Sequence, residues 1–213
     1  EKIILPHTID FKMKLFEDLG HYLLFPDANR CAFCNSYTKD IICPDCEKKL
    51  LNLRCIDACS CYYYDGLVRQ IIHDLKFNNK RYLYRAVALI MSSSLPKGDI
   101  ITNVPISAKR KRTRGYDQSE LIAKEIARIC GVKYIPLLKK IKDTPAQSAL
   151  DAAERRKNVI GAYECLPFSD IADKKIILID DVITTGATME ECKKILYKNN
   201  IKNVTSFSFA KTK

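Results

Sequence analysis

The segment Ile176-Ile-Leu-Ile-Asp-Asp-Val-Ile-Thr-Thr-Gly-Ala-Thr188 joins an apolar run to two acids and a loop of small residues. Ile176 to Ile179 has the length and composition of a buried strand. An amphipathic helix is expected to follow the loop, from Thr188 to Asn199. A buried strand, a short loop and a helix in this order predict an α/β fold with a mostly parallel sheet.

The chemistry of this segment suits a phosphorylated sugar. Ligands of open α/β sheets bind beyond the carboxyl ends of the strands, where Asp180 and Asp181 are expected. The loop should offer backbone N–H groups and hydroxyls at a helix N-terminus, which favours a phosphate. Two carboxylates are compatible with a phosphate nearby if they hold sugar hydroxyls or a divalent cation. The Gly-Lys pair of a Walker loop is absent. The alternative is an ordinary strand, turn and helix with surface acids.

The segment resembles the signature of the type I phosphoribosyltransferases, which bind phosphoribosyl pyrophosphate (PRPP). The resemblance implies that Asp180 and Asp181 hold the ribose hydroxyls and, indirectly, Mg²⁺. It assigns the 5-phosphate to the loop residues Thr184, Thr185, Gly186, Ala187 and Thr188. It also implies a parallel sheet flanked by helices over about residues 60 to 213, with a mobile loop around Asp143 to Arg156.

A second segment ends another predicted strand, Asp99 to Ile106. The same resemblance places a pyrophosphate-binding loop there, at Val104, Pro105, Ile106 and Ser107. Taken alone, this tetrapeptide is equally a simple turn at a strand end.

The rest of the chain alternates between strand and helix patterns. Asp117 is expected to cap a helix, with Glu120 as its capping-box partner and Gly131 at its C-terminal end. Residues 139–156 read as a long loop. Strands are expected at 61–64, 132–135 and 204–209, and further helices at 10–25, 67–75 and 81–94.

The ten cysteines are unevenly distributed, since seven of them lie between Cys31 and Cys61. Two CxxC pairs, eight residues apart, can supply four thiolates to one structural Zn²⁺: Cys31, Cys34, Cys43 and Cys46. All four positions would be filled by protein, so this zinc should not be catalytic. Cys55, Cys59 and Cys61 could be part of a second site, or buried or unpaired thiols. We expect a helix and a zinc knuckle at 1–60 and a phosphoribosyltransferase-like domain at 61–213.

Basic residues outnumber acidic ones by 36 to 25. Such a surplus favours polyanionic partners, although it can also be a solvated surface. Five cations follow the second segment and suit a phosphodiester backbone: Lys109, Arg110, Lys111, Arg112 and Arg114. Tyr116 and Tyr62 to Tyr64 could stack on bases, or could equally be core residues.

The order of motifs along the chain resembles the ComF family of competence proteins. These motifs are Leu23–Pro26, the CxxC knuckle, Leu75–Phe77, Val104–Ser107, Arg112–Gln118, Asp143–Gln147, Glu154–Asn158 and the acid-pair segment. The resemblance implies a cytoplasmic protein of natural transformation that is associated with single-stranded DNA and PRPP. The partners that it implies are the ATPase ComFA and the recombination mediator DprA.

Three functions are compatible with the sequence. The first is a PRPP-binding protein that handles single-stranded DNA during DNA uptake. The second is an active phosphoribosyltransferase with a nucleobase or small-molecule acceptor, although no catalytic residue can be assigned. The third is a regulator that uses PRPP as an effector. No run of eighteen apolar residues and no secretory signal pattern is present, so we expect a cytoplasmic protein without membrane insertion.

Overall fold

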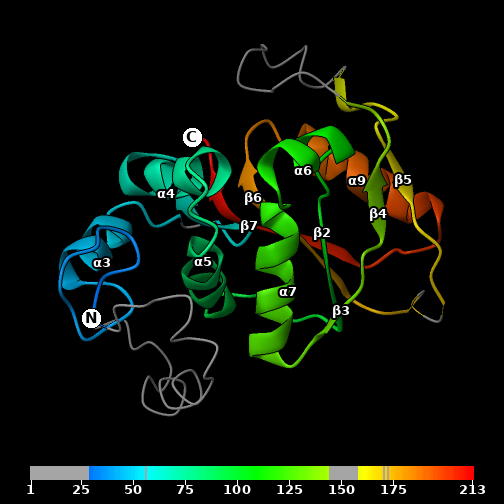
Figure 1. Ribbon diagram of the computed structural model, residues 1–213. Helices are drawn as coiled ribbons and strands as arrows, with labels where there is room; N and C mark the ends of the chain where they lie inside the picture. The colour runs from blue at the N-terminus through cyan, green and yellow to red at the C-terminus, as the bar shows by residue number, and fades with distance from the viewer. Residues whose placement is uncertain (1–28, 56, 144–157, 170, 172) are drawn as a thin grey trace.

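The computed structural model of the chain describes residues 29–55, 57–143, 158–169, 171 and 173–213. Its main sheet has five parallel strands in the order β1-β7-β6-β2-β3 (Figure 1). The strands are β1 Ser60–Tyr63, β2 Ile100–Asn103, β3 Lys133–Tyr134, β6 Ile176–Ile183 and β7 Val204–Lys211. The helices are α3 Pro44–Leu51, α4 Gly66–Phe77, α5 Leu83–Ser92, α6 Ala108–Arg114, α7 Gln118–Cys130 and α9 Ala187–Lys198. The predicted fold class, a type I phosphoribosyltransferase-like parallel sheet flanked by helices, is confirmed.

Both faces of the sheet are buried, and β6 explains why its sequence is apolar without alternation. Ile177 and Ile179 belong to a hydrophobic cluster that includes α4, α5 and α7. Ile176 and Leu178 point to the opposite face, where a second cluster includes residues of α9 and of the β4–β5 pair. A parallel strand covered on both sides must therefore be apolar at every position.

The acid pair lies inside β6 and not beyond its end, which corrects the expected end of the strand at Ile179. β7 pairs with β6 all the way to Ile183, and Asp180 is opposite Ser208 in the register. The backbone hydrogen bonds to β7 thus continue the strand through two residues that have low strand propensity.

The predicted cap of α7 is present, but its capping box is only half formed. Asp117 accepts a hydrogen bond from the backbone N–H of Glu120 at 3.1 Å, and Gly131 ends the helix with φ 66°. The Glu120 carboxylate does not complete the box, because it accepts hydrogen bonds from Lys111 and Lys124. The helix is therefore held at its start by one side chain of the pair.

The sequence patterns do not predict four of the described elements, α3, α6, β4 and β5. The basic run forms helix α6, which Ser107 caps through the N–H of Arg110 at 3.3 Å. Part of the predicted long loop is strand β4, Leu138–Lys140, which pairs antiparallel with β5, Tyr163–Cys165. The strand is too short for its alternation to stand out in the sequence. The predicted helix 10–25 and residues 144–157 lie outside the described residues.

The cysteine knuckle packs against the main domain without a core of its own. Its buried residues, among them Cys31, Phe33 and Leu50, join the cluster formed by α4, α5 and α7. In Figure 1 the knuckle and α3 lie on the side of the molecule away from β4 and β5. Among the described residues, no helix combines the length and apolar character required for a membrane span.

Candidate functional site

Two neighbouring strands bring the predicted phosphate-binding segments to the same edge of the sheet. β6 leads into the loop 184–186 and then α9, while β2 leads into 104–107 and then α6. Because β2 and β6 are parallel and directly paired, both loops lie at their carboxyl ends. Segments more than seventy residues apart in the chain are thereby placed side by side.

The loop after β6 has the geometry of a tight helix start. Gly186 is the N-cap of α9 and has φ 76°, a backbone conformation that residues other than glycine rarely adopt. The hydroxyl of Thr185 accepts a weak hydrogen bond from the N–H of Ala187 at 3.5 Å. Thr212 donates to the carbonyl of Thr184 at 3.2 Å, which ties the loop to the end of β7.

The two adjacent acids have different environments. Asp181 is 3 % exposed, and both of its oxygens are used: Lys76 donates to Oδ1 at 2.8 Å and Gln118 donates to Oδ2 at 2.7 Å. Asp180 is less deeply buried and accepts through Oδ1 from Ser119 at 2.9 Å. Asp181 is therefore bound within the protein, and Asp180 is the acid that remains accessible to a ligand.

The pKa of Asp180 is raised to about 7, first by burial and then by repulsion from Asp181, while Lys76 and Ser119 oppose the shift. This carboxyl group thus titrates close to neutral pH. Its ionised form, which is the better acceptor for sugar hydroxyls, becomes dominant above that pH.

We expect the raised pKa of Asp180 to make the protein less stable as the pH rises through about 7. Below its ordinary pKa of 3.8 the group is protonated in both states, and between 3.8 and about 7 only the folded state holds the proton. The free energy of unfolding of the wild type, minus that of Asp180→Asn, should therefore fall between pH 5 and pH 8. Urea unfolding of both proteins across this range measures the difference, and parallel curves would contradict the shift.

The loop after β2 is in contact with Asp143, the last described residue before 144–157. Ser107 is buried and donates to Asp143 at 2.6 Å, and Lys109 lies 3.6 Å from the same carboxylate. The hydrogen bond from Ser107 lowers the pKa of Asp143. The Ser107 hydroxyl, which the sequence predicts to bind pyrophosphate, is thus hydrogen-bonded to the carboxylate of Asp143.

Lys140 was not predicted as a site residue. It is only 8 % exposed, and its ammonium nitrogen lies 5.2 Å from the centre of the Tyr163 ring on β5. Burial and then repulsion from Arg110 lower the pKa of Lys140, while Asp180 and Asp143 act in the opposite direction. A lysine so placed can neutralise an anionic ligand near Asp180. The three residues Leu138–Lys140 are too few for the sequence to indicate that the second lysine is turned inward.

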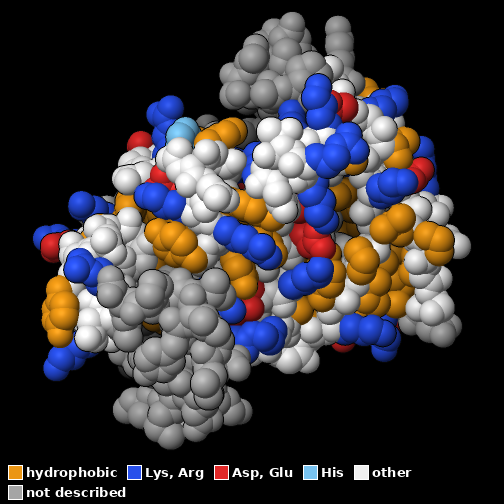
Figure 2. All heavy atoms as spheres, viewed as in Figure 1, with side chains coloured by type: hydrophobic (Ala, Val, Ile, Leu, Met, Phe, Trp, Pro, Cys, Tyr) orange, Lys and Arg blue, Asp and Glu red, His pale blue; other side chains and the backbone are white. Residues whose placement is uncertain are grey.

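The basic helix α6 does not present all of its cations in the same way. Lys109 and Arg112 are exposed, and Lys111 pairs with Glu120 at 2.7 Å. Arg114 is half-buried and donates to the side-chain oxygen of Gln118. Figure 2 shows that lysine and arginine side chains gather around α6 on the visible face. The predicted cluster exists, but Arg114 is turned toward the acid pair.

Two tyrosines that were considered for base stacking belong to the core. Tyr116 is buried, and its hydroxyl donates to the carbonyl of Leu75. Tyr62 is partly buried and meets Phe209 edge to face, with 5.4 Å between the ring centroids. Both rings thus pack with the core cluster.

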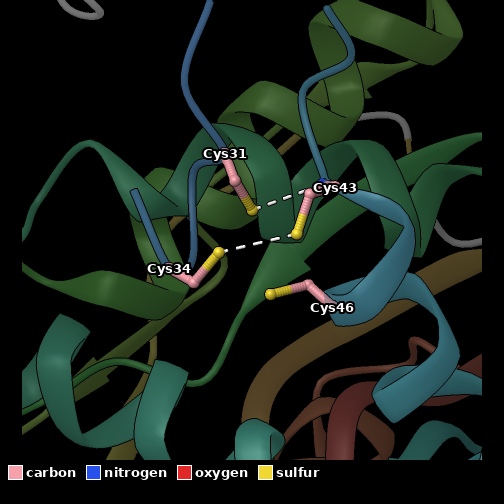
Figure 3. Close-up of side chains that lie close together, drawn as sticks. All are labelled: Cys31, Cys34, Cys43 and Cys46. Carbon is pink, nitrogen blue, oxygen red and sulfur yellow. Dashed lines mark hydrogen bonds between the residues drawn. The ribbon is translucent and has the colours of Figure 1, made fainter. Parts of the chain in front are cut away.

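The four cysteines of the knuckle converge as the CxxC spacing predicts (Figure 3). All of their sulfur atoms lie within 4.8 Å of one another, and those of Cys34 and Cys43 are 3.5 Å apart. A tetrahedral zinc with Zn–S bonds of about 2.3 Å requires S···S distances of about 3.8 Å, so the cluster fits the ion. Burial raises the pKa of Cys43 and of Cys46, whereas hydrogen bonding to Ser36 lowers that of Cys34 to about 6.

The remaining cysteines of the N-terminal region do not form a second cluster. In the part of the chain that the structure describes, Cys31, Cys34, Cys43 and Cys46 are the one group close enough to share a metal. Cys55 and Cys61 are buried and Cys59 is exposed. The backbone N–H of Cys55 donates to the carbonyl of Cys61 at 2.9 Å, so these residues serve local structure.

Comparison with known proteins agrees with this geometry. The phosphoribosyl transferase domain family matches residues 116–212, which include α7, the acid pair and the loop before α9. Competence protein F of Haemophilus influenzae is 27% identical over 152 residues, 66% of each chain. Competence protein ComFC of Streptococcus pneumoniae is 28% identical over 202 residues, which cover 87% of this chain and 89% of that protein.

These similarities support the ComF family for this chain. The match to the Haemophilus relative spans about two thirds of that protein, whereas the match to DNA utilization protein YhgH of Escherichia coli K12 covers 92% of it at 24% identity. Among solved structures, an allosteric regulatory enzyme of purine biosynthesis is 19% identical, with a TM-score of 0.36. The overlap covers 58% of this chain and 24% of the chain of that enzyme. Two of the motifs on which the resemblance rests, Leu75–Phe77 and Arg112–Gln118, supply Lys76 and Gln118 to the acid pair.

Proposed function

We propose that this ComF-family chain binds Mg²⁺–PRPP at the carboxyl edge of β2 and β6 and handles single-stranded DNA in natural competence. The observation that supports this proposal most is that the two adjacent acids have different partners. Asp181 is neutralised internally by Lys76, and Asp180 stands next to a loop that can accept a phosphate. A ribose 5-phosphate requires this pairing of a hydroxyl acceptor with an anion site.

Each part of the ligand would have its own residues. Asp180 would accept from the ribose hydroxyls, and residues 184–188 would hold the 5-phosphate at the start of α9. Residues 104–107 and Lys140 would face the pyrophosphate, with Asp143 displaced from Ser107 by the incoming anion. Mg²⁺ would arrive with the pyrophosphate and reduce its negative charge.

The cysteine cluster would hold a structural Zn²⁺. Four protein thiolates complete a tetrahedral shell and leave no position for a substrate. The ion would fix the knuckle against α4 and α5, whose cluster contains the buried cysteines. Its role would be to stabilise the fold and not to take part in chemistry at the sheet edge.

Helix α6 would supply phosphate contacts to DNA. Its exposed cations follow the proposed pyrophosphate loop without an intervening element, so a strand on α6 would pass close to the bound PRPP. Two of the relatives are named competence proteins and others DNA utilization proteins, which supports a role in DNA uptake. The ATPase ComFA and DprA are the protein partners that we propose to test by co-purification.

Fluorescence anisotropy of a labelled single-stranded oligonucleotide, with and without excess Mg²⁺–PRPP, tests this function directly. We expect binding that weakens with salt, because phosphate contacts release counterions. A shift of the affinity by PRPP would show that the two sites are coupled. Failure of the protein to bind the oligonucleotide would overturn the DNA part of the proposal, and calorimetry with Mg²⁺–PRPP tests the other part separately.

We predict that Lys109→Glu combined with Arg112→Glu will weaken DNA binding and flatten its salt dependence. Removal of two phosphate contacts should lower the slope of log affinity against log salt by about 1.4. The matched control is Lys198→Glu with Lys202→Glu, the same change of charge on exposed residues at the opposite edge of the sheet. Equal effects of the two pairs would mean that α6 binds no DNA and that only net charge matters.

An active transferase is the second candidate, and the pKa of Asp180 favours it. A carboxyl group that titrates at about 7 beside the proposed ribose can accept or donate a proton at neutral pH. Release of pyrophosphate from PRPP in the presence of nucleobases or DNA ends tests this activity. Binding of PRPP that changes DNA affinity without release of pyrophosphate would favour the role of an effector.

A further inference from the structure

Phe77 is a large apolar side chain left open to solvent beside the site. It ends α4 and is 67% exposed, although it directly follows Lys76, whose ammonium group pairs with Asp181. Its ring meets the His73 ring with 5.0 Å between centroids, and the Arg114 guanidinium carbon lies 5.6 Å from the centre of the ring. Phe77 is thus an aromatic ring bordered by a cation and a second ring.

The ring is mounted on a rigid support. Asp74, one turn earlier, is buried and accepts hydrogen bonds from Lys80 at 2.9 Å and Asn78 at 2.6 Å. These bonds tie the segment that follows α4 to the helix. The Tyr116 hydroxyl donates to the carbonyl of Leu75. Together with the ion pair of Lys76, these contacts hold the last turn of α4 in place. Because the backbone that carries the ring is already ordered, binding of a ligand does not have to order it.

A short series of contacts joins the ring to the proposed ribose site. Arg114 lies over Phe77 and donates to Gln118, which donates to Asp181 at 2.7 Å. Arg114 is also the last residue of α6, the helix with the exposed cations. The ring therefore stands where the acid pair and the basic helix meet.

We propose that Phe77, with Arg114 beside it, is a base-stacking platform that takes one unpaired nucleobase of the DNA strand bound on α6. An exposed aromatic ring next to cations is the combination by which proteins hold single strands, because every base has a π-face and every nucleotide has a phosphate. Bases of a duplex are already stacked and cannot cover the ring. The inference rests on the DNA binding proposed above and assigns the site at which a base would approach the ribose pocket.

The sequence contains no tryptophan, so Phe77→Trp creates a single fluorescent reporter at this position. We expect single-stranded DNA to quench its emission, whereas an abasic oligonucleotide of equal length and a duplex should not. Tyr37→Trp is the matched control, since Tyr37 is 73% exposed and lies in the knuckle. Equal quenching of the two reporters, or DNA binding without quenching at position 77, would overturn the platform.

Phe77→Ala should reduce the affinity for base-bearing single strands by about 5- to 150-fold. The affinity for the abasic oligonucleotide should stay unchanged, and Phe77→Tyr should retain most of the wild-type affinity. Because Phe77 is exposed, all variants should unfold at the wild-type temperature. If Phe77→Ala binds both oligonucleotides as the wild type does, base stacking on Phe77 is ruled out, whereas DNA binding on α6 is not. If the wild type binds no DNA, the proposed function fails and the platform with it.

Discussion

Asp180→Asn should reduce the affinity for Mg²⁺–PRPP by about 10- to 100-fold, the size expected when hydrogen bonds to a charged acceptor are lost. The protein should remain folded, because an asparagine oxygen can still accept the hydrogen bonds from the Ser119 hydroxyl and the Asp181 N–H, and burial disfavours the charge of Asp180. Titration calorimetry above pH 7, where the wild-type carboxyl group is ionised, measures the loss. An affinity equal to that of the wild type would remove Asp180 from the site.

Asp181→Asn should act on stability first. This substitution leaves the ammonium group of Lys76 without its counter-charge next to a residue that is almost completely buried. We expect the free energy of unfolding to fall by about 1.5 to 3 kcal/mol, the contribution of a hydrogen bond to a charged group. Urea unfolding of the two single variants therefore separates the roles of the adjacent acids.

The double variant and one control complete the comparison. Asp180→Asn with Asp181→Asn should lose both PRPP affinity and stability, because the two effects arise at different contacts. Lys76→Met combined with Asp181→Asn removes the unpaired charge and should recover part of the stability without restoring the site. A loss of stability in Asp180→Asn as large as that in Asp181→Asn would contradict the assignment of separate roles.

Cys31→Ser should remove the metal and unfold the knuckle. Cys31 is buried, and its sulfur accepts the backbone N–H of Cys43 at 3.3 Å, so it takes part in both the ligand cluster and the local fold. Structural zinc sites contribute apparent free energies of about 10 to 16 kcal/mol at neutral pH, far more than most single contacts. Elemental analysis should find about one zinc per wild-type chain and none in the variant.

The damage should extend beyond the knuckle. Its buried residues share a cluster with α4 and α5, and α4 carries Lys76 and Phe77. We therefore expect a lower unfolding temperature, poor solubility and weaker DNA binding in Cys31→Ser. Cys130→Ser is the control, because Cys130 is exposed and lies outside the cluster. Full metal content in Cys31→Ser, or equal damage in Cys130→Ser, would contradict a structural zinc.

The local patterns of the sequence were sufficient for the fold class and for the residues of two clusters. An apolar run before two acids indicated a buried strand of a parallel sheet, and the CxxC spacing indicated four ligands that converge. Both conclusions depend on residues close together in the chain, whose geometry follows from backbone periodicity and turn length.

The strands and helices of the main sheet, the cysteine quartet and the two candidate phosphate loops could all be predicted from the sequence, whereas α3, α6, β4 and β5 could not. Which acid of the pair stays accessible to a ligand depends on the tertiary structure, because Lys76, Gln118 and Ser119 come from helices 61 to 105 residues away. The tertiary structure also turned Arg114 inward, placed Lys140 in the interior and left Phe77 open. Burial and charge pairing are properties of the assembled core, and residues distant in the chain set them when the sheet and helices pack.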